Sequence, residues 1–442
     1  MIRILSIAFL FLCLAARPAA AQQRHELTAR EAVDYGLKNN TLVKNALLDV
    51  DIQQQTNREI TASALPSLNG NYSNTANIII PTNLLPGELA GLPKGTFIPV
   101  RFGTTYNQGI GVSLQQLLFD GQVFVGLQAR RASIQFAEKA VDVTEENIRA
   151  NIYKVYYQLS ASSSQLAILD ANIARIQKLA DDTRKLFENG FAERLDISRL
   201  EVQLANLQTE KNKAVNQISN GYYGLKVLMG MPTEDTLILT EKISETDIRS
   251  GVLDAPAYAF KDRQEYQYAL LGKELREYNV RRYKLTKYPT VALAGALNAN
   301  RMSNTFGFDG RWFSGSYLSL SINMPIFDGW ARQARVQRAQ LELRQVENNI
   351  RDLELTISRD VQVALNNYNN ALSTLNTQRR NMELAEQVYN QTRLKFQEGI
   401  GSNTEITSAQ ADLQVAQNNY ILALYDASNA KIDFLKATGK LQ

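Results

Sequence analysis

Residues 330–396 carry a seam of mostly apolar side chains that recur at steps of three and four, the period of one face of a long helix. The seam consists of Leu343, Val346, Ile350, Leu353, Ile357, Val361, Ala364, Tyr368, Ala371, Leu375, Gln378, Met382, Ala385, Tyr389, Thr392 and Phe396. This is a heptad spacing with one stutter, at Leu353, Ile357 and Val361, and such seams pack helices side by side. After a turn at 397–403 the helical pattern resumes as far as Gly439. The pattern predicts a helical hairpin over residues 330–438.

The same seam occurs earlier in the chain, with the same stutter. It consists of Ile134, Ala137, Val141, Thr144, Ile148, Ile152, Val155, Leu159, Ser162, Leu166, Leu169, Ile173, Ile176, Ala180, Thr183 and Phe187. Gly190 after this helix matches Gly399 after the later one, and Gly230 matches Gly439. A shared stutter, turn and terminal glycine over so long a run indicates a duplication. A second helical hairpin is therefore predicted over 122–229.

Segments that precede the long helices alternate between apolar and polar residues, which is the period of a strand. Ile110, Val112 and Leu114 alternate with Gly, Ser and Gln, for example. Strands are expected at 68–77, 106–119, 291–300 and 315–327. Such strands suit a transmembrane β-barrel whose apolar face meets lipid and whose polar face meets a wet lumen. A half-buried sheet in a soluble domain has the same period. The barrel is favoured only because the chain also carries a signal peptide and two long helical hairpins.

Each copy is predicted to consist of a helix, a strand, a loop, a strand, a long helix, a turn and a helix. The first copy occupies residues 22–230 and the second occupies 262–442. Residues 231–261 form a connector with no clear counterpart, in which Leu237–Leu239 is a possible short strand.

The first copy begins with a capping box, Thr28 followed by Glu31, which starts a helix. This helix is expected to extend to about Ser63. Prolines and glycines throughout 78–102 predict a long irregular loop.

Residues 1–21 have the features of a secretory signal peptide. A short basic start precedes the apolar residues 4–16, and Ala19-Ala20-Ala21 fits a cleavage site. The only cysteine, Cys13, would then be removed, which leaves no disulfide or thiolate metal site. Cys13 could instead be a lipid-attachment site, although Leu12 is large where such sites have a small residue.

The composition and the motifs do not support catalysis or nucleic-acid binding. The net charge is only +4 at pH 7, and a nucleic-acid partner would require a strongly basic face. The single histidine, His25, is expected in a mobile tail, and no metal spacing or phosphate-binding loop is present. No cofactor is expected. No segment after the signal peptide is apolar enough for a transmembrane helix, so a membrane role would require strands.

Four strands cannot close a barrel, and open edges in lipid leave backbone groups unpaired at a cost of several kcal/mol each. Association into a closed ring would solve this problem. Two chains would supply eight strands, and three chains would supply twelve, enough for a pore.

The ordered set of elements resembles the TolC-like outer-membrane efflux factors over nearly the whole mature chain. The resemblance rests on Leu65-Pro66-Ser67-Leu68, Phe119-Asp120-Gly121, Phe327-Asp328-Gly329 and the two helical turns. It implies a mainly α-helical fold with transmembrane β-strands. A homotrimeric, twelve-stranded barrel in the outer membrane would continue as an α-helical tunnel in the periplasm. It further implies that the turns dock a periplasmic adaptor protein, which couples the channel to an inner-membrane pump.

The resemblance assigns adaptor docking to both turns. The residues concerned are Phe187, Gly190, Phe191, Phe396, Gly399, Ile400, Gly401 and Ser402. Capping of the helices would alone explain the glycines, whereas the apolar Phe191 and Ile400 favour contact with a partner.

Asp181 and Asp182 are candidates for an acidic periplasmic gate, which the family often has. The matching position in the second copy is Asn390, and a solvated outer face is an equally good interpretation. Trp312, Phe313 and Tyr317 could belong to an interfacial aromatic belt or could pack a loop.

The leading prediction is a passive outer-membrane exit duct for small molecules in a tripartite efflux system. A type I protein secretion channel is the first alternative. A secreted coiled-coil structural or adhesion protein without a pore is the second.

Overall fold

The computed structural model describes residues 23–250 and 258–441. The predicted signal peptide, with Cys13, lies outside these residues. The chain forms two compact units, and each unit combines segments of both predicted copies. One unit comprises the chain up to Asp49, Ala137–Leu270 and Asn349–Gln442, and the other comprises Val50–Phe136 and Leu271–Asn348.

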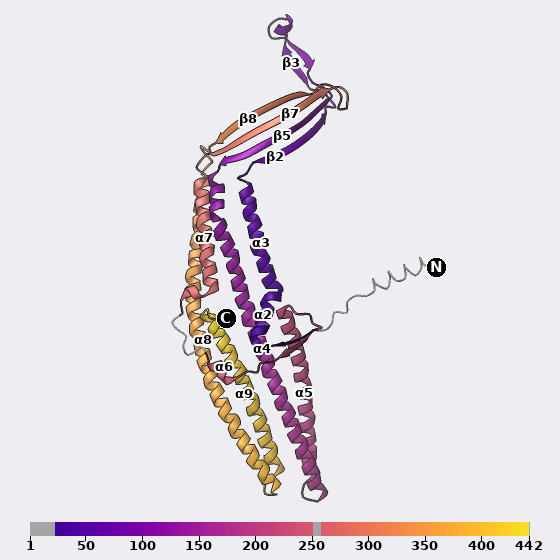
Figure 1. Cartoon of the computed structure of the whole chain (residues 1–442), viewed down its shortest axis with the longest axis vertical. Helices are drawn as coiled ribbons and strands as arrows, with labels where there is room; N and C mark the ends of the chain where they lie inside the picture. Colours follow the sequence, from indigo (N-terminus) through magenta and orange to yellow (C-terminus); the bar gives the residue numbers. More distant parts are fainter. Residues whose placement is uncertain (1–22, 251–257, 442) are drawn as a thin grey trace, which may run out of the picture. The chain divides into compact units, whose positions relative to one another are not determined.

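Both predicted long hairpins are present as helices (Figure 1). The first consists of α4 (Gly121–Glu188) and α5 (Arg194–Met229), and the second of α8 (Ala331–Gln397) and α9 (Asn403–Ala437). Seam residues of both long helices are buried, and the fully buried ones include Ile152, Ile176, Ile357 and Leu375. The heptad pattern therefore identifies the faces that the structure buries.

The first predicted helix is divided at Asn40, so the expectation of one continuous helix is wrong. Helix α2 (Ala29–Asn39) ends there and α3 (Thr41–Ala62) begins. Asn40 is extended, and its side-chain oxygen accepts a hydrogen bond from the backbone N–H of Leu42 at 2.7 Å. Its amide donates to the Leu228 carbonyl on α5 at 2.6 Å. The side chain thus caps α3 and joins it to α5, which offsets the lost helical hydrogen bonds.

The N-terminal tail is also ordered, contrary to the expectation that His25 is mobile. Strand β1 (Arg24–Leu27) pairs in parallel with β6 (Thr236–Leu239), which lies where the short connector strand was predicted. His25 lies 3.5 Å from the Asp235 carboxylate. Leu27 and Leu237 pack on the same apolar cluster as α2, α4 and α5, so burial holds the tail in place.

The connector packs on the second hairpin. Helix α6 (Glu245–Arg249) buries Ile248 among α8 and α9, and the Tyr368 hydroxyl donates a hydrogen bond to the Ile248 carbonyl at 2.9 Å. A short 3-10 turn, η2 (Phe260–Asp262), follows, and then the 22-residue helix α7 (Gln264–Leu285).

A four-stranded antiparallel sheet lies in the unit formed by Val50–Phe136 and Leu271–Asn348, with strand order β2-β5-β7-β8. The strands are β2 (Ser67–Ala76), β5 (Tyr106–Phe119), β7 (Thr290–Ser303) and β8 (Phe313–Asn323). Strand β8 ends before the predicted residue 327, since Pro325 cannot donate a ladder hydrogen bond.

Residues 78–102 are not the irregular loop that their prolines indicate. Strands β3 (Thr82–Pro86) and β4 (Phe97–Arg101) form an antiparallel hairpin around a 3-10 turn η1 (Gly87–Ala90). An isolated two-stranded hairpin tolerates proline because both of its strands are edges.

Within the described residues, we find no helix that combines the length and the apolar character needed to cross a membrane.

Candidate functional site

The four-stranded sheet has two chemically different faces. Paired residues of an antiparallel sheet point to the same side, so the register defines rows across all four strands. One row consists of Leu68, Leu114, Gly295 and Leu318. The next row, on the opposite face, consists of Ser67, Gln115, Ala294 and Ser319. The alternation expected from the sequence is therefore aligned across the whole sheet.

The apolar face is uncovered. Leu68 is 71 % exposed, Leu318 is 74 % exposed and Leu297 is 68 % exposed. Apolar rows of this size on a soluble monomer would be unusual, and they mark a surface that meets a partner or a lipid phase. Phe313 and Tyr317 lie on the polar face by register, beside Asn300 and Ala296. That placement argues against their predicted role in a lipid-facing aromatic belt.

Both edges of the sheet are open. Strands β2 and β8 are the outer strands, and every residue of both is exposed. Among the described residues, neither outer edge has a strand partner. A long, unpaired edge beside an apolar face is a template for pairing with another chain.

The helical turns lie at the same end of their unit (Figure 1). At the first turn, Gly190 has φ +79°, and the Phe191 N–H donates to the Leu186 carbonyl at 2.8 Å. At the second, Gly399 has φ +76°, and the Ile400 N–H donates to the Lys395 carbonyl at 3.0 Å. Both glycines therefore close their helices in the left-handed conformation, as the capping interpretation requires.

The predicted tip residues differ in what surrounds them. A Cβ added at Gly190 or Gly399 would meet no atom within 4 Å, whereas one at Gly401 would lie 2.9 Å from the Phe396 nitrogen. The side-chain oxygen of Ser402 accepts a hydrogen bond from the Glu405 N–H at 3.2 Å and caps α9. Gly401 and Ser402 thus have structural roles at the turn, and the space beside Gly190 and Gly399 is open.

Apolar side chains stand beside that open space. Phe191 is 81 % exposed and Ile400 is 76 % exposed. Phe187 is also exposed, but Phe396 packs against the cluster that joins the two hairpins. Phe191 and Ile400 are therefore the apolar tip residues most accessible to a partner.

Apolar clusters fix the order of the helices in this unit as α8, α9, α4 and α5 (Figure 1). One cluster joins α8 to α9, a second joins α9 to α4, and a third joins α4 to α5. A further cluster near the turns contains residues of all four helices. The two tips are consequently held together by one shared core.

A buried polar pair in that core was not anticipated from the sequence. The Gln410 amide of α9 donates to the Asn172 oxygen of α4 at 2.9 Å, and both side chains are almost fully buried. Asn172 Nδ2 and Gln410 Oε1 have no hydrogen-bond partner. Neither Asn172 nor Gln410 belongs to a seam predicted from the sequence, so no sequence signal distinguished this pair from the many other Asn and Gln residues of the long helices.

The candidate gate residues are half-buried, with side chains 49 % and 44 % exposed, and are locally paired. Asp181 lies 3.5 Å from Arg184, which also contacts Glu201 of α5 at 3.1 Å. Asp182 lies 3.9 Å from Lys185. Each carboxylate is thus partly balanced by a base on the same helix, and such exposed pairs are weak.

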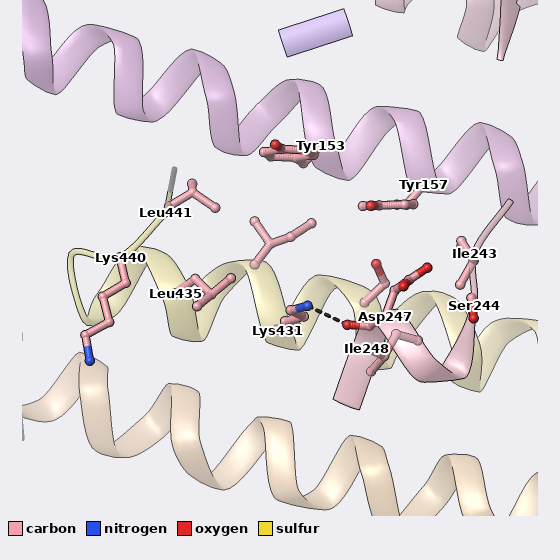
Figure 2. A pocket seen from close by; sticks show the side chains of 12 residues that line it. Tyr153, Tyr157, Ile243, Ser244, Asp247, Ile248, Lys431, Leu435, Lys440 and Leu441 are labelled. Atoms are coloured by element: carbon pink, nitrogen blue, oxygen red, sulfur yellow. Dashed lines mark hydrogen bonds between the residues drawn. The ribbon is translucent and has the colours of Figure 1, made fainter. Parts of the chain in front are cut away.

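A cavity of about 290 Å³ lies between α4, α6 and α9 (Figure 2). Tyr153 and Tyr157 of α4 stack with ring centroids 6.3 Å apart, opposite Lys431 of α9. The Lys431 ammonium donates to the Asp247 carbonyl, and burial lowers the pKa of Lys431. Burial, with the nearby Glu241 carboxylate, raises the pKa of Tyr157. The Lys431–Asp247 hydrogen bond attaches α6 to α9.

In the described part of the chain, no three His, Cys, Asp or Glu side chains cluster closely enough to hold a metal ion.

Residues 259–440 match the outer membrane efflux protein family. The chain is 20% identical over 436 residues to a probable efflux pump outer membrane protein, TtgC, of Pseudomonas putida, with 95% of this chain and 86% of that protein covered. It is 19% identical over 336 residues to the outer membrane protein TolC of Vibrio cholerae, with 75% and 76% covered.

A crystal structure of CusC superposes with a TM-score of 0.76 at 17% sequence identity, over 96% of this chain and 98% of CusC. The fold is therefore shared along nearly the whole length of both chains. The family consists of outer-membrane channels, and the resemblance seen in the sequence is confirmed. The duplicated hairpins, the two-faced sheet and these matches together show that the chain is similar to the TolC-like outer membrane efflux proteins, whose family model matches residues 259–440.

Proposed function

We propose that the protein is the outer-membrane channel of a tripartite efflux system, a passive conduit through which small molecules leave the cell. The observation that carries this proposal is the sheet with one apolar face, one polar face and two open edges. An apolar face suits lipid, a polar face suits a wet lumen, and open edges require further strands. The strands lie in the outer membrane and the helices lie in the periplasm.

Three copies form the channel. Pairing of β8 of one copy with β2 of the next removes every open edge, and three four-stranded sheets give a twelve-stranded barrel. Two copies would give eight strands, whose interior side chains fill.

The helices support the same ring. In the helix order α8, α9, α4, α5, each end member has one neighbouring hairpin helix, and shorter helices also pack on them, α2 on α5 and α6 on α8. The end members also expose large apolar side chains. Those of α5 are Leu195, Val202, Val215, Tyr223 and Val227, and those of α8 in this unit are Leu355, Val363, Leu384, Val388 and Leu394. Seating α5 of one copy against α8 of the next buries both sets, repeating the contact between the hairpins within one chain.

The helical turns dock the hairpin of a periplasmic adaptor protein. The open space at Gly190 and Gly399 lets another backbone approach closely, and the exposed Phe191 and Ile400 provide apolar contacts beside it. The adaptor in turn couples the channel to an inner-membrane pump.

Asp181 and Asp182 act as the periplasmic gate. Threefold symmetry would place their carboxylates around one axis, where a ring of negative charge favours cations. Their carboxylates are half-exposed, which supports this role, and the neighbouring Arg184 and Lys185 limit the negative charge that they present.

The protein has no enzymatic activity of its own in this proposal. Transport is driven by the pump, and the channel supplies only a path.

The first experiment is light scattering of the particle extracted in detergent from the outer-membrane fraction. Three chains per particle, with conductance in a planar bilayer, would support the proposal. A monomer or dimer in the soluble periplasm would refute the barrel, and the hairpins would then belong to a coiled-coil scaffold. A matched variant, Leu318→Asp on the apolar face, should lose the membrane-extracted trimer, while Ser319→Asp on the polar face should retain it.

A further inference from the structure

The polar face of the sheet carries no charged side chain. Its rows contain amides, hydroxyls, small residues and a few aromatic and aliphatic side chains. They include Asn69, Asn71, Ser73, Ser113, Gln115, Asn298, Asn300, Ser319 and Ser321. Asn298 lies across Gly111, where an added Cβ would come 2.2 Å from the Asn298 oxygen. The small residues of this face therefore make room for its amides.

The one charged residue within the four strands is on the other face. Arg301 of β7 pairs in register with Gln108 and is only 3 % exposed. Its guanidinium donates to the Gln108 oxygen at 3.1 Å and to the carbonyls of Thr305 and Asp309. The loop between β7 and β8 thus covers this charge on the apolar side, away from the polar face.

Charges beyond the strand ends are too distant to impose a potential at mid-strand. Ser319 lies at least about 14 Å from either end of β8 at a rise of about 3.4 Å per residue. The Debye length at 0.1 M salt is about 10 Å. The nearest charges along β8 and its neighbour are therefore largely screened at the row of Ala294 and Ser319.

We propose that the strand-built part of the lumen is electrically neutral and admits small anions, cations and zwitterions equally. Any charge selection must then occur in the helical part of the channel. This inference rests on the proposed function, because the polar face is a lumen only in the closed assembly.

The test uses single cysteines and charged thiol reagents. Cys13→Ser removes the only native cysteine from the background. Ser319→Cys then places a thiol on the polar face, and Leu320→Cys places one on the apolar face of the same strand. Intact outer-membrane vesicles are treated with an anionic and a cationic methanethiosulfonate of similar size. The ratio of the two rates is divided by the ratio for a free thiol in solution.

At Ser319→Cys, we expect a normalised ratio within about twofold of one. A local potential of one kT per charge would change this ratio about sevenfold, so the assay resolves a modest field. Ala294→Asp in the Ser319→Cys background provides a positive control, since Ala294 is the direct cross-strand neighbour of Ser319. It should favour the cationic reagent severalfold, whereas Ala294→Asn should not.

The possible failures are distinct. A normalised ratio at Ser319→Cys that differs from one by sevenfold or more, while Leu320→Cys still does not react, would refute the neutral lumen. It would leave the proposed channel unaffected. Leu320→Cys reacting as fast as Ser319→Cys would instead overturn the proposed orientation of the sheet in the membrane, and the neutral lumen with it.

Discussion

Gly399 provides the sharpest test of adaptor docking, because the strain and the bulk of a substitution can be separated there. Its φ of +76° would cost any L residue about 1–2 kcal/mol. Nothing lies within 4 Å of an added Cβ, so a larger side chain causes no clash within the chain. Gly399→Ala and Gly399→Trp therefore carry nearly the same strain and differ in the volume they place at the tip. If an adaptor packs into this space, Trp should weaken docking by about 1–3 kcal/mol, roughly 5- to 150-fold in Kd.

The assay combines three readouts: trimer content of the outer membrane, adaptor binding to the purified trimer, and efflux of a fluorescent pump substrate. Both Gly399 variants should retain trimers, but only Gly399→Trp should lose adaptor binding and efflux. Gly91→Trp is the matched control, since Gly91 also has a positive φ and open space but lies in the loop between β3 and β4. Unchanged adaptor binding by Gly399→Trp, with trimers intact, would refute the docking role of this turn.

Three further predictions follow from contacts in the helical unit. The double variant Asp181→Asn/Asp182→Asn should reduce cation selectivity in single-channel recordings. The control Asp170→Asn, which removes an exposed ion pair with Lys211, should leave selectivity unchanged. An equal loss of selectivity in the double variant and in the control would contradict the gate. Asn172→Leu alone leaves the Gln410 amide buried without a partner and should destabilise the fold by about 1–3 kcal/mol. Adding Gln410→Leu should restore the thermal midpoint of the detergent-solubilised trimer. A double variant that is less stable than the single variant would show that the polar pair is needed. Burial and the Glu245 carboxylate raise the pKa of Tyr420 to about 12, so its contribution to stability is complete below pH 10 and is lost as the pH rises toward 12. Tyr420→Phe should therefore show a smaller fall in thermal midpoint between pH 9 and pH 11 than the parent, and identical falls would refute this.

The long helices and the sheet were predictable because each depends on a repeated local pattern. A heptad seam with the same stutter in both copies identifies residues such as Ile152 and Ile357, which the structure buries. The alternation of apolar and polar residues along β5 and β8 likewise predicts the two faces of the sheet. These signals are periodic and extend over many residues, so single exceptions do not hide them.

Three features that the sequence did not predict depend on distant contacts. The break at Asn40 is stabilised by a hydrogen bond to Leu228, far away in the sequence. Strand β1 exists because β6 lies beside it, and four residues alone cannot specify a strand. The Asn172–Gln410 pair is buried only because α4 and α9 meet. The tip glycines were located correctly as turns, but their open surroundings could be seen only in three dimensions.

The two open sheet edges also constrain how the protein can be made. Until it assembles, each newly exported chain presents full-length bare strands at β2 and β8 together with an uncovered apolar face. Such a chain is a substrate for indiscriminate edge-to-edge aggregation in the periplasm. Membrane insertion and assembly must therefore be as fast as export. Otherwise chaperones must bind the sheet until the chain is inserted. Overproduction beyond that capacity should yield aggregates and degraded chains, and free monomer should not accumulate.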